Sequence, residues 1–280
     1  MKPFRTFEMS DPALAPEGLR FVTVKSAALG QRADITLFVP RQLDSAAHGL
    51  HDVPIVTLLH GVYGSHWAWA FQGGAHRTLQ ALVDCGAVPP MLLAMPSDGL
   101  WGDGSGYVPH ADADFERWIV DEVPAAARQR RPELDDTSPL AVIGLSMGGF
   151  AALRLAARYP QRWCAAAGHS SITETAQLDA LIEEPRQGWS SAPETTSVLA
   201  AVDAALHAGV ALPPLYLDCG LDDPLLPANR ALHAALRDRG VVHDWRENPG
   251  GHDWSYWQMH LADSLAFVAD AIGTRPETTA

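Results

Sequence analysis

Four short apolar runs constrain the fold of this chain more than any other feature. They occupy residues 54–61, 91–97, 140–146 and 164–170, and each is apolar over nearly its whole length. Strands buried on both faces of a parallel sheet have this composition, whereas strands with one solvent-exposed face alternate apolar and polar residues. Each run ends in glycine, proline or serine before a helix-like segment, as βαβ units do. The sequence therefore predicts an α/β protein with a mostly parallel sheet.

Weaker runs extend this sheet to about eight strands. Residues 21–24 and 34–40 lie close together with no helix between them, which predicts an antiparallel hairpin. Residues 214–220 and 243–248 follow the four apolar runs and add two further strands. We expect helices on both faces of the sheet, over residues 67–85, 111–131, 150–158, 229–239 and 254–272.

Residues 171–210 interrupt this alternation because they are longer than a plain crossover between strands. They hold two short helical patterns around a Pro-Arg-Gln-Gly-Trp turn. An insertion here lies above the carboxyl ends of the strands, where ligands bind in open α/β sheets. A small cap and a two-helix crossover both stay open. We expect residues 1–280 to form a single domain that includes this segment.

Size and charge exclude several classes of partner. The chain has 280 residues, of which 47% are hydrophobic and 19% charged, as in globular proteins with a sizeable core. Its formal net charge of -13 argues against nucleic acids and anionic membranes, because both need Lys and Arg patches. The first residues lack the apolar core of a secretory signal, and the three cysteines form no C-x-x-C pair. We expect a cytoplasmic, reduced chain, and a homo-oligomer stays open.

The segment GLSMGG carries the first chemical signal. Gly144, Ser146 and Gly148 match the pattern G-x-S-x-G, in which a serine occupies a sharp strand-to-helix turn. Such a turn is crowded, so glycine is needed two positions either side of the serine. Glycine and serine also make ordinary turns, and the rest of the chain has to support the motif.

An aspartate and a histidine follow Ser146 in the chain order that this architecture requires. Asp222 and Asp223 lie in the loop after the run at 214–220, whereas Asp218 still lies within that run. We prefer Asp223 as the acid, and Asp222 stays open as an alternative.

His252 is the predicted base. The two glycines before it allow a sharp bend, and Trp254 and Trp257 follow it and would shield its ring from water. The competing histidines at strand ends or in the last helix pattern are His60, His169 and His260.

Two backbone N–H groups are expected to stabilise the oxyanion that forms during acyl transfer. Met147 follows the serine at the start of a helix and supplies one by its position. Val62, in the strand-to-loop junction LLHGVYG, supplies the other, and Gly61 permits close approach. His60 is expected to support this turn.

Four segments together resemble the α/β-hydrolase esterase family that includes esterase D (S-formylglutathione hydrolase), feruloyl esterase domains and the antigen 85 mycolyltransferases. They are LLHGVYGSHWAW, GLSMGGFAAL, DCGLDDPLLPANRALHAAL and PGGHDWSYW, and they span roughly residues 20–270. The resemblance implies an α/β-hydrolase fold, with Ser146, Asp223 and His252 as the catalytic triad. HGVYG stands where S-formylglutathione hydrolases resemble SGLTC, which disfavours their thioester substrate.

A Gly-rich loop at residues 95–109 and the 171–210 segment offer candidates for substrate binding. We expect Trp101, Tyr107 and Trp189 to line the pocket, although aromatic side chains more often serve packing. Acidic residues in the same loop do not match the D-x-D-x-D-G calcium pattern. No metal and no cofactor are predicted.

We therefore expect a serine carboxylesterase that hydrolyses small-molecule esters of short acyl chains through an acyl-enzyme. An acyltransferase and a thioesterase would use the same triad, and both stay open. A catalytically silent binding module on a hydrolase fold is the alternative from another class.

Overall fold

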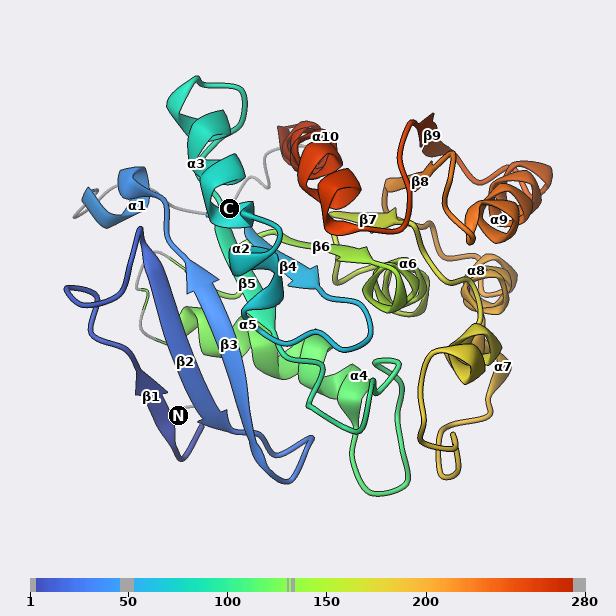
Figure 1. The fold of residues 1–280 in the computed structure, drawn as a ribbon, viewed down its shortest axis with the longest axis horizontal. Coiled ribbons are helices and arrows are strands. Elements are labelled where there is room, and N and C mark those ends of the chain that lie inside the picture. The colour runs from blue at the N-terminus through green and yellow to red at the C-terminus, as the bar shows by residue number, and fades with distance from the viewer. Residues whose placement is uncertain (1–3, 46–52, 130, 132–133, 274–280) are drawn as a thin grey trace.

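A computed structural model describes residues 4–45, 53–129, 131 and 134–273. Nine strands form one sheet in the order β1-β2-β3-β5-β4-β6-β7-β8-β9, and β4 to β9 are parallel to one another (Figure 1). The strands are β1 Phe7–Met9, β2 Leu19–Lys25, β3 Arg32–Phe38, β4 Ile55–Leu59, β5 Leu92–Pro96, β6 Leu140–Leu145, β7 Ala165–His169, β8 Leu215–Gly220 and β9 His243–Asn248.

The predicted α/β class and the eight predicted strands are confirmed. Every residue of β4, β5, β6 and β7 is buried, as expected for the four apolar runs. β2 and β3 form the predicted antiparallel hairpin, and β3 also pairs antiparallel with β5. The additional strand, β1, is three residues long and lies at the edge of the sheet, so it has too short a pattern to recognise.

Helices cover both faces of the sheet (Figure 1). Apolar side chains of α2, α3 and α10 pack on one face, and those of α5, α6, α8 and α9 pack on the other. The helices are α1 Arg41–Ser45, α2 Ala68–Phe71, α3 Ala75–Asp84, α4 Phe115–Arg117, α5 Val123–Arg128, α6 Met147–Arg158, α7 Pro193–Thr196, α8 Val198–His207, α9 Leu226–Asp238 and α10 Trp254–Gly273. Among the residues that the structure describes, no helix has the length and hydropathy needed to cross a bilayer.

Two predicted helices are interrupted. The segment 67–85 divides into α2 and α3 at Gly73 and Gly74, and Gly74 has a φ of 61°, which a helix interior does not permit. The segment 111–131 becomes helical only at Phe115, where the Asp114 carboxylate accepts the backbone N–H of Arg117 at 2.9 Å. A π-helical turn at Trp118–Glu122 then joins α4 to α5.

The 171–210 segment connects β7 to β8. Its second half holds α8, which packs beside α6 as a crossover helix (Figure 1). Its first half holds a 3-10 helix at Thr175–Ala180 and loops that reach the end of the sheet where Ser146 lies.

Candidate active site

Ser146 occupies the predicted turn between β6 and α6. Its φ of 53° and ψ of -117° place it in a region that side-chain-bearing residues rarely adopt. A Cβ on Gly144 would lie 2.1 Å from the Gly148 carbonyl oxygen, and a Cβ on Gly148 would lie 2.3 Å from the Leu59 carbonyl oxygen. The crowding inferred from the motif is therefore present, and only glycine fits at both flanking positions.

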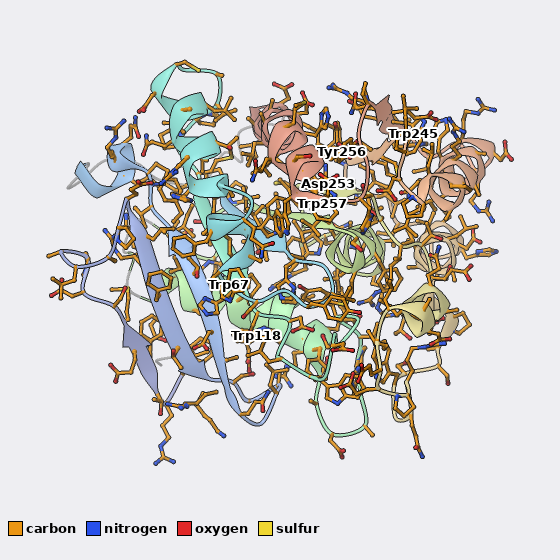
Figure 2. The ribbon with its side chains drawn as sticks, in the orientation of Figure 1. Trp67, Trp118, Trp245, Asp253, Tyr256 and Trp257 are labelled. Carbon is orange, nitrogen blue, oxygen red and sulfur yellow. The ribbon has the colours of Figure 1, made fainter. Side chains whose placement is uncertain are left out.

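Ser146 lies within hydrogen-bond distance of His252. The distance from Ser146 Oγ to His252 Nε2 is 3.1 Å, and His252 Nδ1 lies 2.9 Å from Asp223 Oδ2. The edge of the Trp257 ring packs against the imidazole, with ring centroids 5.0 Å apart. Trp257 lies with Asp253 and Tyr256 at the N-terminal end of α10 (Figure 2).

The two candidate acids have different environments. The Asp223 carboxylate is buried, and its second oxygen accepts the Leu225 backbone N–H at 2.8 Å. Burial raises the pKa of Asp223, but the hydrogen bonds that its carboxylate accepts, above all from His252, outweigh it, so its pKa lies below the ordinary value. Asp222 is exposed, and its backbone N–H donates to Gly250. The structure thus brings Asp223, and not Asp222, to the histidine.

The competing residues His169 and Asp218 are paired with each other. His169 Nδ1 lies 2.8 Å from Asp218 Oδ2, and its Nε2 lies 3.0 Å from Ser264 Oγ. The Tyr216 and Tyr256 hydroxyls also donate to the Asp218 carboxylate. These groups repeat the Asp–His–Ser order of the site, yet His169, Asp218 and Ser264 are all fully buried. No substrate reaches them, so this arrangement serves packing.

His60 fixes the loop that carries Val62. The Asp98 backbone N–H donates to His60 Nε2 at 3.0 Å, so the ring hydrogen sits on Nδ1, which donates to the Gly61 carbonyl at 2.7 Å. Burial lowers the pKa of His60 and favours this neutral form. In a planar trans peptide the N–H points opposite to the carbonyl, so the Val62 N–H faces away from the His60 ring.

Val62 and Met147 both present an unused backbone donor near Ser146. Within the described residues, neither N–H donates to a protein acceptor. Met147 is the first residue of α6, where N–H groups have no partner within the helix. A Cβ on Gly61 would lie 3.2 Å from Ser146 Cβ, which shows how closely the loop before Val62 approaches the nucleophile turn.

A cavity of about 390 Å³ lies beside Ser146 and His252. Most of its wall comes from the loop after β4, from α2 and from the start of α10. The remaining wall residues are Leu145 and Ser146 at the end of β6, His252 before α10, and Leu181 of the 171–210 segment. It is bordered by Gly61, Val62, Tyr63, Gly64, Ala68, Gln72, Leu145, Ser146, Leu181, His252, Trp254 and Trp257.

The three aromatic residues expected to line this cavity lie elsewhere, and that expectation is corrected. Tyr107 is fully buried and donates its hydroxyl to the His60 carbonyl at 3.1 Å. Trp101 and Trp189 pack against His110, with ring centroids 4.8 and 4.6 Å away. The position of an aromatic residue in a loop near the site does not determine the direction in which its ring points.

Four aromatic or aliphatic residues take their place: Tyr63, Leu181, Trp254 and Trp257. From the sequence, the two tryptophans are predicted only to shield the His252 ring from water. Tyr63 belongs to the HGVYG junction, and its position beside Val62 is the sequence feature that could have predicted it as a wall residue. Leu181 had no signal of its own beyond membership of the 171–210 segment.

Acidic residues in the 95–109 loop accept hydrogen bonds from backbone N–H groups. Asp98 accepts the N–H groups of Leu100 and Ser105 at 2.9 and 2.7 Å, and Asp103 accepts that of Glu183 at 2.9 Å. Within the ranges that the structure describes, no three His, Cys, Asp or Glu side chains gather closely enough to hold a metal ion.

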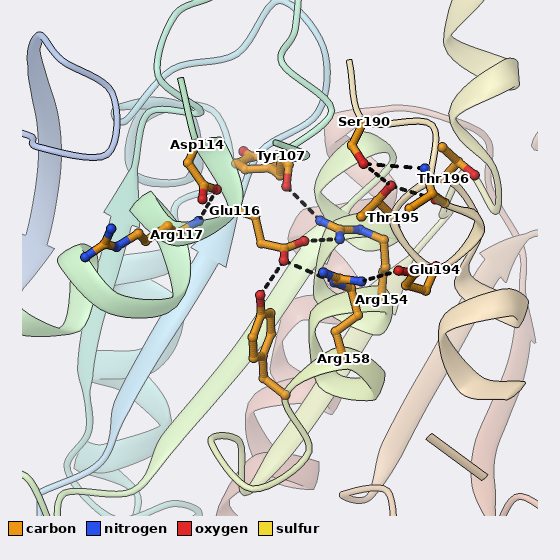
Figure 3. Close-up of polar contacts among 12 residues, drawn as sticks. Tyr107, Asp114, Glu116, Arg117, Arg154, Arg158, Ser190, Glu194, Thr195 and Thr196 are labelled. Atoms are coloured by element: carbon orange, nitrogen blue, oxygen red, sulfur yellow. Dashed lines mark hydrogen bonds and ion pairs between the residues drawn. The ribbon is translucent and has the colours of Figure 1, made fainter. Parts of the chain in front are cut away.

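A buried ion-pair network contacts the 95–109 loop at Tyr107 (Figure 3). Arg154 on α6 pairs with Glu116 and donates to the Tyr107 carbonyl at 2.7 Å. Arg158 lies 3.0 Å from the same Glu116 carboxylate. Because the Tyr107 hydroxyl donates to the His60 carbonyl, these contacts connect the helix after Ser146 to the end of β4.

The open, mostly parallel sheet and the serine on its strand-to-helix turn, beside a histidine and a buried aspartate, define an α/β-hydrolase. The chain belongs to the family described as "Putative esterase", whose model matches residues 26–268. It is thus an ester-hydrolysing enzyme, and the predicted family is confirmed.

Known proteins of this kind resemble the chain over most of its length. An acetyl esterase from Caldicellulosiruptor saccharolyticus is 25% identical over 228 residues, which cover 76% of this chain and 82% of the relative. A ferulic acid esterase structure has a TM-score of 0.75 at 24% identity, over 90% of this chain and 98% of that one. The fluorophosphonate-binding serine hydrolase F of Staphylococcus aureus has a TM-score of 0.76 at 19% identity, with the same coverage of 90% and 98%. At these identities the two structures show the fold.

Proposed function

We propose that this protein is a serine carboxylesterase that cleaves small carboxylic esters through an acyl-enzyme. The observation that carries the proposal is the hydrogen-bonded chain from Ser146 Oγ through His252 to Asp223, with distances of 3.1 and 2.9 Å. A serine hydroxyl is a weak nucleophile at neutral pH and requires such a base. The family match supports an ester as the substrate.

In the first half of the reaction, Ser146 attacks the ester carbonyl while His252 takes the hydroxyl proton. The N–H groups of Val62 and Met147 donate to the oxyanion. His252 then gives its proton to the leaving alcohol, and the acyl group stays on Ser146. Asp223 holds the Nδ1 hydrogen and stabilises the imidazolium that forms.

In the second half, His252 takes a proton from the water that attacks the acyl-enzyme, and then returns it to Ser146 Oγ as the carboxylic acid leaves. The cavity of about 390 Å³ is near the small end of ligand sites, which supports short acyl chains. The described chain acts in this proposal as one catalytic domain. The first half of the 171–210 segment supplies a small cap through Leu181.

Ser264 offers a matched control for testing Ser146, because its hydroxyl also lies 3.0 Å from a histidine Nε2 but is fully buried. Hydrolysis of p-nitrophenyl acetate, butyrate and octanoate is measured for the wild type, Ser146→Ala and Ser264→Ala. We expect Ser146→Ala to lose roughly 10⁴-fold or more in kcat and Ser264→Ala to lose less than about tenfold. Equal rates for the wild type and Ser146→Ala would contradict the proposal. Product analysis with an added alcohol distinguishes hydrolysis from acyl transfer.

A further inference from the structure

The wall of the cavity beside Ser146 carries almost no charge. Apart from the oxyanion loop, Ser146 and His252, its wall is formed by Ala68, Gln72, Leu145, Leu181, Trp254 and Trp257. Among the described residues no Lys, Arg, Asp or Glu borders it. A charged substrate group placed here would lose water without gaining a counter-ion.

Two tryptophans form one side of this cavity. The rings of Trp254 and Trp257 meet edge to face, with centroids 5.3 Å apart and an interplanar angle of 89°. Trp257 is 6% exposed, so its ring is held firmly by the packing around it. An aromatic wall of this kind favours contact with apolar or neutral groups.

Another part of the wall is a bridge between two loops. The Tyr63 hydroxyl donates to the Leu181 carbonyl, which connects the oxyanion loop to the 171–210 segment. The Tyr63 backbone N–H donates to the Asp103 carbonyl at 3.1 Å. The bridge fixes the width of the cavity, and it too adds no positive charge.

Acidic residues lie near the Tyr63–Leu181 bridge. Asp103 Oδ2 accepts the Glu183 N–H at 2.9 Å, and the Asp103 N–H donates to Glu184 at 3.0 Å, so three acidic residues lie together. Arg186, on the same segment, is engaged by both oxygens of Asp179 at 2.5 and 2.8 Å. The local field therefore repels anions before they reach the cavity.

A further carboxylate adjoins the base. Asp253 follows His252 and accepts the Ser255 N–H at 2.9 Å, and the hydrogen bonds from Ser255 and Tyr256 hold its pKa below the ordinary value. Asp253 is therefore ionised at neutral pH, and it adds negative charge next to His252 in the chain.

We propose that this cavity receives an uncharged part of the ester, and that the enzyme discriminates strongly against esters that carry a carboxylate in their acyl group. The inference rests on the proposed function, since it assumes that the acyl group of the Ser146 ester occupies this cavity. Desolvation of an unpaired carboxylate and repulsion by the surrounding acidic residues both act in this direction. The substrate class is therefore neutral esters, aliphatic or aromatic.

Three esters with acyl groups of similar length test how hydrolysis depends on the charge of the acyl group. They are p-nitrophenyl heptanoate, methyl p-nitrophenyl adipate and mono-p-nitrophenyl adipate, of which only the last is anionic at pH 7.5. We expect kcat/KM for the anionic ester to be at least about 100-fold below both neutral esters, after subtraction of spontaneous hydrolysis. A difference of less than about tenfold would overturn the inference.

A substituted cation gives the second readout. Gln72 borders the cavity and is exposed, so Gln72→Arg places a guanidinium at its edge. We expect this variant to raise the anionic-to-neutral ratio of kcat/KM about tenfold, because the carboxylate gains a partner. The control Val242→Arg adds the same charge at a residue that is 90% exposed and does not border the cavity. An equal effect in both variants would refute a local cause.

Binding to Ser146→Ala separates this inference from the proposed function. Quenching of tryptophan fluorescence by the neutral and anionic esters reports affinity without turnover. Tighter binding of the neutral esters supports the charge selectivity, and equal affinities overturn it. Undiminished hydrolysis by Ser146→Ala would instead refute the serine mechanism.

Discussion

Substitution of Asp223 and Asp218 by asparagine should give opposite results, although both carboxylates lie against a histidine Nδ1. The two distances are 2.9 Å for Asp223 and 2.8 Å for Asp218. Distance therefore does not distinguish the pairs. His252 is 27% exposed and faces Ser146 at the cavity, whereas His169 is fully buried.

For Asp223→Asn we expect kcat/KM to fall by roughly 10⁴-fold, because the amide no longer holds the hydrogen on Nδ1 and the wrong tautomer faces Ser146. That factor corresponds to about 5.4 kcal/mol of transition-state stabilisation. The loss should appear mainly in kcat, since the cavity wall is unchanged.

For Asp218→Asn the main loss should be stability. Its carboxylate accepts hydrogen bonds from His169, Tyr216 and Tyr256. The amide oxygen retains the first two, while the amide nitrogen faces the Tyr256 hydroxyl. Weakening one charge-assisted hydrogen bond costs about 2 kcal/mol. For a domain of this size the melting temperature should fall by about 4 to 8 °C.

The assay is kcat/KM for p-nitrophenyl butyrate at 25 °C, with thermal melting followed by circular dichroism. Asp218→Asn should keep more than a tenth of the activity at a temperature where it is fully folded. A loss of 10³-fold in folded Asp218→Asn, together with an active Asp223→Asn, would refute the assignment of the two pairs.

Three further predictions concern the scaffold. Gly148→Ala should lower both activity and melting temperature, because its Cβ would lie 2.3 Å from the Leu59 carbonyl oxygen, whereas Gly273→Ala, with open space around it, should change neither. Glu116→Gln should cost about 3 to 5 kcal/mol near pH 7 by leaving the buried Arg154 without its acidic partner. Burial raises the pKa of Glu116, but the two arginines and Tyr159 lower it overall, so the ionised carboxylate stabilises the fold above about pH 4.5. In urea titrations, the difference in unfolding free energy between the wild type and Glu116→Gln should therefore shrink as the pH falls below that value. Burial lowers the pKa of His110 to about 4, so on acidification the unfolded chain takes up a proton before the folded one does. The free energy of unfolding should therefore fall between about pH 6.5 and pH 4. His110→Phe should flatten this fall in urea unfolding measurements, and an unchanged dependence on pH would contradict the prediction.

Much of the architecture was predictable because its causes act between neighbours in the chain. Apolar runs, glycine punctuation and helical spacing located eight of the nine strands. The exception, Phe7–Met9, is an edge strand with too few residues for a pattern. Gly73 and Gly74 could have predicted the break between α2 and α3, but the helical pattern on both sides of them favoured one continuous helix over residues 67–85.

The site was partly predictable for the same reason. Steric crowding made Ser146 recognisable between its glycines, and the chain order of the strands placed an acid and a histidine after it. The aromatic residues were not predictable, because the burial of Trp101, Tyr107 and Trp189 depends on partners such as His110 and the His60 carbonyl. Local sequence does not encode the direction in which a loop side chain points.

The amino-acid sequence alone was sufficient for the α/β sheet, the serine turn and the order of the functional groups, since these follow from periodicity and local sterics. Tertiary packing alone decided that Asp223 meets His252 while Asp218 meets His169, and that Trp254 and Trp257 border the cavity. Ser146 and His252 are separated by 106 residues, and their 3.1 Å contact exists because β6 and β9 are parallel, so that the loops after both strands lie at the same end of the sheet. Burial then separates two similar Asp–His pairs into one that a substrate can reach and one that it cannot.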